Sequence, residues 1–249
     1  EIAGALDLID YMNGVFGLKL GENYKYRLSL GDRDNKTKYF DDPKAWEESE
    51  EILRKVLKER NVEFVEAKDE AAFYGPKIDV QMTKMNGVEE TAFTVQYDFV
   101  MPGRFDLKYV DNNGEEKRPL VVHRSSIGAI ERTAAFLLEH FNGALPLWLS
   151  PVQVKVVPIS EKVMEYATEV TEGLKKAGIR VELDTDAESL GKKIRSAESM
   201  KTPYMVIVGE KEVENKTVSL RARGQKDLGP LTISDLINKI QGEITSKAI

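Results

Sequence analysis

The sequence predicts an α/β protein of two domains: an antiparallel sheet with helices in residues 1–150, and a smaller mixed-sheet domain in residues 151–249. In the first part, alternating strands follow one another through hairpin turns, which favours an antiparallel sheet. In the second part, strands alternate with helices, which is typical of a separate mixed sheet. Pro146 and Pro151 mark the boundary between these patterns.

Composition excludes several classes of site. The chain contains no cysteine, which excludes disulfides, thiolate metal sites and a cysteine nucleophile. It shows no apolar run of about 18 residues and no signal peptide, so we expect a cytoplasmic protein without a membrane partner. The net charge is −6, but residues 151–249 carry 16 basic against 15 acidic side chains. That second part could therefore still bind RNA through a local basic patch.

Helix and strand patterns alternate along the first 67 residues. Residues 1–16 predict an amphipathic helix, because their apolar side chains recur at helical spacing. Residues 24–30 alternate between apolar and polar side chains, which indicates a half-buried strand. Asp42-Pro43 is a helix start signal for the apolar repeat that follows, and residues 62–67 read as a short strand.

A hairpin is the strongest local signal in the next segment. Residues 78–82 and 91–99 flank Asn86-Gly87, a dipeptide that favours tight hairpin turns. A second turn at residues 111–116 and a strand at 119–124 would complete an antiparallel meander.

A long helix is predicted after this sheet, and it looks buried on most sides. Its main stripe and its remaining surface are both largely apolar. The stripe consists of Ile127, Ile130, Ala134, Leu137, Leu138 and Phe141. Arg132 lies opposite that stripe, and a buried guanidinium needs an anionic partner. A structural carboxylate and a bound phosphate are both open as that partner.

The second domain follows a strand–helix order. The predicted strands are residues 152–158, 179–183, 203–208 and 217–221. The predicted helices are residues 161–177, 189–200 and 234–244.

Several strings resemble class II aminoacyl-tRNA synthetases. Gly128-x-x-Glu131-Arg132 resembles their motif 3. The longer string HRSSIGAIERTAAFLLEHFNGALPLWLSPVQV, with AFYGPKID and TVQYDF before it, is similar to threonyl-tRNA synthetases in particular. The resemblance implies an incomplete class II catalytic sheet followed by an anticodon-binding domain. It also implies threonine–tRNA ligase activity with threonine, threonine tRNA and ATP with Mg²⁺, in an enzyme that is a homodimer when complete.

The resemblance assigns roles on the predicted sheet. It places Tyr74 and Lys77 facing the threonine and the tRNA 3′ end, where a lysine offers a point charge to carboxylate or phosphate. Gln96 and Asp98 lie two apart on one strand face, which would be the floor of the active site. By the same resemblance, Gly128 and Arg132 belong to the motif that contacts ATP, and Arg132 would contact its phosphates. Without the resemblance, the strand face of Gln96 and Asp98 reads as a polar sheet face toward solvent.

The resemblance also makes His123 one of three protein ligands of a Zn²⁺ ion that selects threonine. The family's other ligands, a cysteine and a histidine, and its motifs 1 and 2 precede the region where this chain begins. We therefore expect a fragment that binds no stoichiometric zinc, is inactive alone and dimerises weakly. A non-catalytic RNA-binding or regulatory relative is the alternative, and an α/β protein whose pocket serves only stability is a third possibility.

By the same resemblance, Glu212 and Arg221 would read anticodon bases. The side chains that could hold the RNA backbone are Arg223, Lys216 and Lys226. The residues alone also fit a solvated polar hairpin. Where the family often has Arg-Asn-Glu-Lys, this chain has Asp186-Ala187-Glu188-Ser189, so it departs from the family at part of the anticodon contact.

Overall fold

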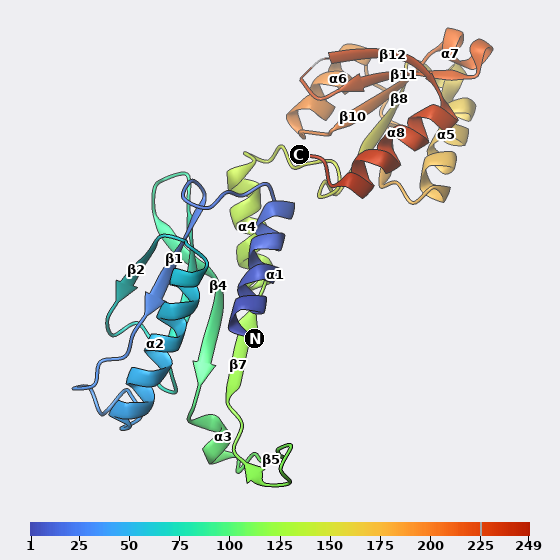
Figure 1. Cartoon of the computed structure of the whole chain (residues 1–249). Helices are drawn as coiled ribbons and strands as arrows, with labels where there is room; N and C mark the ends of the chain where they lie inside the picture. The colour runs from blue at the N-terminus through green and yellow to red at the C-terminus, as the bar shows by residue number, and fades with distance from the viewer. Residues whose placement is uncertain (225) are drawn as a thin grey trace. The chain divides into compact units, whose positions relative to one another are not determined.

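A computed structural model describes residues 1–224 and 226–249, which form two compact units, Glu1–His140 and Phe141–Ile249 (Figure 1). The division comes at Phe141, ahead of the boundary that the prolines suggested. Residues 141–150 belong to the second unit because Leu147 is buried in its core.

The first unit is built on a mixed sheet with the strand order β2-β1-β3-β4-β7. Its strands are β1 (Tyr24–Ser29), β2 (Phe64–Ala67), β3 (Lys77–Thr83), β4 (Glu89–Asp98) and β7 (Val121–Ser125). The predicted antiparallel pairing holds for β1–β3, β3–β4 and β4–β7. Strands β1 and β2 are parallel instead. The helix α2 (Pro43–Glu59) connects these two strands, and such a crossover brings the chain back in the same direction.

Two helices, α1 (Ile2–Val15) and α2, cover the apolar face of this sheet (Figure 1). Asp42 caps the start of helix α2, because its carboxylate accepts a hydrogen bond from the Ala45 amide at 3.1 Å. The fully buried strand side chains on this face are Tyr26, Leu28, Ile78, Val80, Phe93 and Val95. Because side chains alternate along a strand, the opposite face receives the polar residues between them.

The predicted meander is interrupted after β4. The segment that follows forms α3 (Met101–Arg104) and a separate two-stranded ribbon of β5 (Tyr109–Val110) and β6 (Glu116–Lys117). The chain then returns as β7, which pairs directly with β4.

Helix α4 (Ile130–His140) is less buried than the sequence predicted. Most of its main apolar stripe faces outward, with Ile130 exposed by 72% and Leu138 by 50%, whereas Leu137 in the same stripe is buried. The buried side chains are Thr133, Phe136 and Leu137. Burial on most sides was therefore a wrong expectation, because periodicity identifies an apolar stripe but not the element that would cover it.

The second unit contains a mixed sheet with the order β12-β11-β10-β8-β9. Its strands are β8 (Val154–Pro158), β9 (Val181–Leu183), β10 (Tyr204–Val208), β11 (Thr217–Ala222) and β12 (Lys226–Thr232). Its helices are η1 (Glu161–Val163), α5 (Met164–Lys176), α6 (Leu190–Ser199), α7 (Glu210–Asn215) and α8 (Ile233–Ser246). Strands β8, β9 and β10 are parallel, as the strand–helix order predicts. The sequence did not predict α7 or β12.

Within the described residues, no helix is both long and apolar enough to cross a membrane.

Candidate functional site

The polar face of the first unit's sheet carries two rows of residues aligned across β1, β3, β4 and β7. The first row, in register order, is Ser29, Lys77, Gln96 and His123. The second row is Arg27, Asp79, Thr94 and Ser125. All eight side chains are polar, so this face is built for hydrogen bonding rather than for packing against another apolar layer.

Three of the predicted site residues meet Tyr74 at one end of the first row. The Tyr74 hydroxyl donates a hydrogen bond to Gln96 Oε1, and its ring lies 5.4 Å from the His123 ring, centroid to centroid. His123 Nε2 is 2.8 Å from Asp98 Oδ2. Burial, together with the charge of Asp98, raises the pKa of Tyr74, which keeps its hydroxyl protonated as a donor.

A glycine allows Tyr74 to reach this position. At Gly75, an added Cβ would lie 1.8 Å from the Tyr97 carbonyl oxygen, so only glycine fits against β4 there. The backbone amide of Phe99 also donates to the Tyr74 carbonyl at 3.3 Å. The tyrosine is thus held beside the end of β4 by main-chain contacts.

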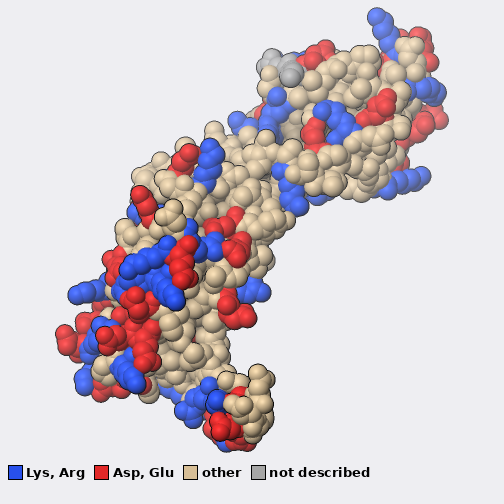
Figure 2. All heavy atoms as spheres, in the orientation of Figure 1, with Lys and Arg blue, Asp and Glu red and all other residues tan. Residues whose placement is uncertain are grey.

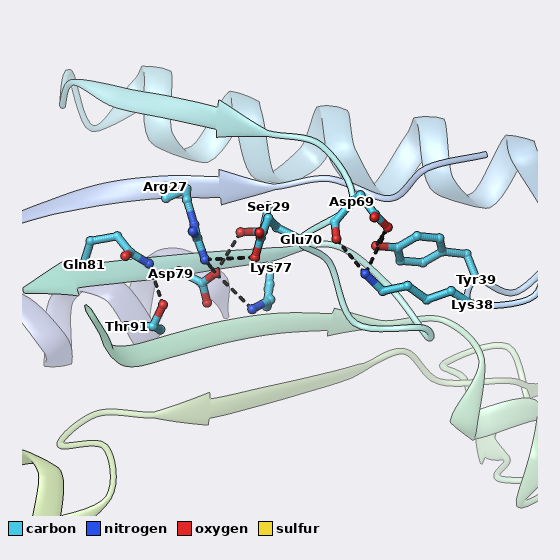
Figure 3. A network of polar contacts seen from close by, with 10 residues as sticks. All are labelled: Arg27, Ser29, Lys38, Tyr39, Asp69, Glu70, Lys77, Asp79, Gln81 and Thr91. Atoms are coloured by element: carbon cyan, nitrogen blue, oxygen red, sulfur yellow. Dashed lines mark hydrogen bonds and ion pairs between the residues drawn. The ribbon is translucent and has the colours of Figure 1, made fainter. Parts of the chain in front are cut away.

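Lys77 points toward the second row, where it meets the buried carboxylate of Asp79 (Figure 3). Asp79 Oδ2 lies 3.0 Å from Lys77 Nζ, 3.0 Å from Arg27 Nη2 and 2.7 Å from Ser29 Oγ. Arg27 Nη2 also lies 3.5 Å from a Glu70 carboxylate oxygen. Lys77 is therefore fixed beside Gln96 and is not a freely moving surface lysine.

Arg132 and Gly128 lie near the other end of β4. Arg132 Nη1 donates to the Thr91 carbonyl at 2.8 Å, and its Nε is 3.1 Å from Glu90 Oε1. Its side chain is 53% exposed, so the predicted buried guanidinium is wrong, and its observed partner is a structural carboxylate. A Cβ at Gly128, where φ is +66°, would come within 2.2 Å of the Ala92 carbonyl oxygen.

This end of the strand opens on a surface pocket of about 370 Å³ that Arg132 lines. Lys84 first, and Arg132 as well, lower the pKa of Glu90. Glu90 therefore remains ionised beside the arginine. No contact between Arg132 and the Tyr74 group is present among the described residues, so the predicted residues form two groups at opposite ends of β4.

The described residues do not by themselves fit a zinc ion. They include no group of three or more histidine, cysteine, aspartate or glutamate side chains that could hold a metal. His123 has only the carboxylate of Asp98 beside its Nε2, and a structural or catalytic zinc needs at least three protein ligands.

The predicted RNA-binding residues of the second unit have different surroundings. Glu212 Oε2 accepts a hydrogen bond from the Gly209 amide at 2.9 Å, which caps helix α7. Arg223 Nη1 donates to the carbonyls of Leu145 and Lys201, each at 3.0 Å, and desolvation lowers the pKa of Arg223. Both side chains are thus engaged in holding the domain together.

Arg221 has an unused hydrogen-bond donor. Its Nε is buried without a hydrogen-bond partner among the described residues. The ammonium of Lys216 lies 5.1 Å from the centre of the Tyr166 ring. The side chain of Lys226 lies outside the described residues.

The segment that departs from the expected pattern is acidic, and it bonds to residues on either side of it. Glu188 Oε1 is 2.5 Å from Lys192 Nζ, and the Asp186 amide donates to Asp184 Oδ1 at 3.1 Å. Basic and acidic side chains are also interspersed on the face shown in Figure 2, without one continuous basic surface. On that face the cations therefore stand among acidic side chains.

The sequence reasoning missed Arg27, Ser29, Asp79 and Thr94. Their signal was the alternation of residues 24–30 and 78–82, which places Arg27 and Asp79 on the polar faces of their strands. The register that brings them together is visible only in the folded sheet.

Comparison with known proteins agrees with this architecture. Residues 35–141 match the model of the tRNA synthetase class II core domain (G, H, P, S and T), and residues 153–243 match the anticodon binding domain. A threonine–tRNA ligase of Clostridium perfringens is 47% identical over 247 residues, or 99% of this chain. One from Streptococcus sanguinis is 43% identical over 249 residues. The chain belongs to the threonyl-tRNA synthetase family.

Solved structures support the same assignment. The RNA binding domain of threonyl-tRNA synthetase from Cryptosporidium parvum superimposes with a TM-score of 0.83 at 33% identity, over 97% of this chain and 59% of that one. A putative threonyl-tRNA synthetase from Aeropyrum pernix gives 0.73 at 27% identity, over 98% and 62%. The chain spans about 38% of the length of both curated relatives.

Proposed function

We propose that this chain forms part of a threonine–tRNA ligase, with the amino-acid site on the polar sheet face and an RNA-binding site in the second unit. The observation that supports this most is the meeting of Tyr74, Gln96, Asp98 and His123 at one end of the first row. These are residues at which the chain resembles the family, and the structure gives them mutual contacts.

The proposed reaction has two steps. A carboxylate oxygen of threonine attacks the α-phosphorus of ATP, and the bond to the bridging oxygen breaks so that pyrophosphate leaves. The terminal hydroxyl of the tRNA then attacks the threonyl carbonyl carbon, and AMP leaves. Positioning and charge neutralisation drive both steps, and magnesium bound to ATP would contribute neutralising charge.

Each residue has a defined part in this proposal. Gln96 and Tyr74 would hold polar groups of the amino acid, and Asp98 keeps His123 oriented. Lys77 would meet carboxylate or phosphate oxygen beside Gln96. Arg132 would contact ATP phosphates from the pocket at the other end of β4, after exchanging its half-buried partner Glu90.

Calorimetric titration with a non-hydrolysable threonyl-adenylate analogue tests the first unit. Gln96→Ala should weaken binding by about tenfold or more, roughly 1.4 kcal/mol, because a polar group of the ligand loses its partner. Gln81→Ala is a matched control on β3, since Gln81 already bonds the Thr91 hydroxyl. Equal losses in both variants would contradict the assignment of Gln96.

Fluorescence anisotropy with a threonine-tRNA anticodon stem-loop tests the second unit. At fixed salt, a loop with its second and third anticodon bases swapped should bind about tenfold more weakly. Arg221→Ala should remove most of this difference, whereas Lys176→Ala, at the end of α5, should not. Equal binding of both loops would oppose the anticodon assignment.

The two assays together also test the alternative of a non-catalytic RNA-binding relative. Selective binding of the stem-loop without any binding of the adenylate analogue would favour it.

A further inference from the structure

We propose that Asp79 is a positioning residue for Lys77, and that Ser29 and Arg27 hold its carboxylate in place for that task. The inference rests on the proposed function of the sheet face, and it assigns a role to three residues to which the family resemblance gave none. In the structure Ser29, Arg27 and Lys77 all contact the carboxylate of Asp79 (Figure 3).

The first step concerns the carboxylate. Asp79 lies in the middle of β3, two residues from Lys77 on the same face, and its side chain is 0% exposed. A buried carboxylate is very costly unless charged or polar donors compensate it. Three donors converge on its Oδ2: Ser29 Oγ at 2.7 Å, Arg27 Nη2 at 3.0 Å and Lys77 Nζ at 3.0 Å.

The second step concerns strand β1, which supplies the two residues that orient Asp79. Ser29 pairs with Lys77, and Arg27 pairs with Asp79, in the register of β1 and β3. Strand β1 therefore supplies both the Ser29 hydroxyl and the Arg27 guanidinium that contact the Asp79 carboxylate. Because strands are rigid, these donors fix the orientation of Asp79 more firmly than loop residues would.

The third step concerns Lys77. A lysine side chain loses about 2 kcal/mol of rotamer entropy when it is immobilised, so an unheld Lys77 would meet a ligand at that cost. One N–H of the Lys77 ammonium donates to Asp79, so two further N–H donors remain. The Lys77 side chain is still 19% exposed. Gln96 lies across the register from it. The fixed ammonium is thus available to an anionic ligand group held at Gln96.

Three atoms mark the second row as a place where polar partners are still needed. Among the described residues, Asp79 Oδ1 and Arg27 Nε are buried without a hydrogen-bond partner. Thr94 Oγ1, on the residue that pairs with Asp79 in β4, is also buried without a hydrogen-bond partner among the described residues. Buried polar groups are nearly always satisfied, so a purely structural ion pair explains this row incompletely.

Lysine-specific labelling of the folded chain tests the positioning directly. Reductive methylation at limiting reagent, followed by mass spectrometry, gives a rate for each lysine. In Asp79→Asn, the rate at Lys77 should rise by roughly tenfold, the factor that corresponds to 1.4 kcal/mol. Lys84, paired with Glu90 at the far end of β3, is the internal control and should be unchanged.

A second variant separates orientation from simple charge pairing. Ser29→Ala keeps every charge and removes only the hydroxyl that orients Asp79. Its Lys77 rate should rise by about threefold, since one neutral hydrogen bond is worth less than a charged one. An unchanged rate at Lys77 in Ser29→Ala, with unchanged circular dichroism, would overturn the proposal even if Asp79→Asn failed to fold.

A double-mutant cycle connects the positioning to the ligand. Lys77→Ala and Asp79→Asn should each weaken binding of the threonyl-adenylate analogue, and Asp79→Asn should have no further effect in the Lys77→Ala background. Additive losses would overturn the proposal, because Asp79 would then act without Lys77. If the unaltered chain does not bind the analogue, the proposed function fails, and the labelling rates still decide the positioning.

Discussion

Each unit of the chain buries one carboxylate against two cations, and the two arrangements differ in access. In the first unit, Asp79 is approached at 3.0 Å by both Arg27 and Lys77. In the second, Asp184 lies 3.4 Å from both Lys155 and Lys193. The charges are the same, a carboxylate at most 1% exposed between two basic groups.

The cations show the difference. The side chain of Lys193 is only 7% exposed and also donates to the Pro158 carbonyl at 3.4 Å, so its charge is enclosed by the protein. The side chain of Lys77 is 19% exposed and lies in a row that continues to Gln96. The difference lies in Lys193 alone, because the side chain of Lys155 is 15% exposed. A buried carboxylate with an enclosed cation stabilises a fold, whereas one with an accessible cation beside a polar row can also present a charge to a ligand.

The largest expected effect comes from breaking the enclosed cluster. Asp184→Asn leaves Lys155 and Lys193 without their carboxylate, and removal of one partner of a buried ion pair costs about 3–5 kcal/mol. We expect the free energy of unfolding of the second unit to fall by that amount. Urea unfolding in a Trp46→Phe background reports this unit through Trp148. A loss under about 1 kcal/mol would show that the cluster is open to water.

A third carboxylate, Asp10 in the first unit, has tyrosine hydroxyls among its donors, and it makes the stability of this unit depend on pH. Asp10 accepts hydrogen bonds from Tyr24 at 3.0 Å and from Tyr26. Burial first, and then Asp10, raise the pKa of Tyr24 to about 12 and also raise the pKa of Tyr26.

Because the folded state holds the Tyr24 proton more tightly than the unfolded state, this stabilisation is complete below about pH 10 and is lost toward pH 12. A shift of this size corresponds to about 2–3 kcal/mol. Thermal unfolding followed by circular dichroism should show this loss, and Tyr24→Phe should flatten it. An equally steep loss in Tyr24→Phe would assign the alkaline transition to other groups.

Removing the carboxylate of the accessible cluster, Asp79, should lower the unfolding free energy by less than removing Asp184. In Asp79→Asn, both Arg27 and Lys77 can turn toward water, so we expect the first unit to lose about 1–2 kcal/mol of unfolding free energy. Urea unfolding in a Trp148→Phe background reports this unit through Trp46. A loss as large as that of Asp184→Asn would remove the distinction between the two clusters.

The smallest effect is expected at the exposed pair of Arg132 and Glu90. Surface ion pairs contribute roughly 0–1 kcal/mol, so Arg132→Ala should leave the unfolding free energy within that range. The same urea measurement through Trp46 checks it, with Lys84→Ala as the control because Lys84 pairs with the same carboxylate. A larger loss would mean that the guanidinium contributes to packing through its stem.

The sequence alone determined most of the element order and the family motifs. Hairpin chemistry at Asn86-Gly87 and the cap at Asp42 are local signals, so β3, β4 and α2 were predictable from neighbouring residues. Helix α7 and strand β12 were missed because α7 is short and polar, and β12 contains a glycine and a proline within its bounds.

Only the tertiary structure decided which residues share a site. Periodicity places Arg27, Asp79 and Gln96 on polar faces of separate strands, but it does not contain the register that aligns them. It likewise does not distinguish a covered apolar stripe from the exposed one on α4, or a free arginine from Arg223, which two backbone carbonyls engage. The physical reason is that periodicity is a property of neighbours in the chain, whereas burial and pairing are set by residues that are distant in it.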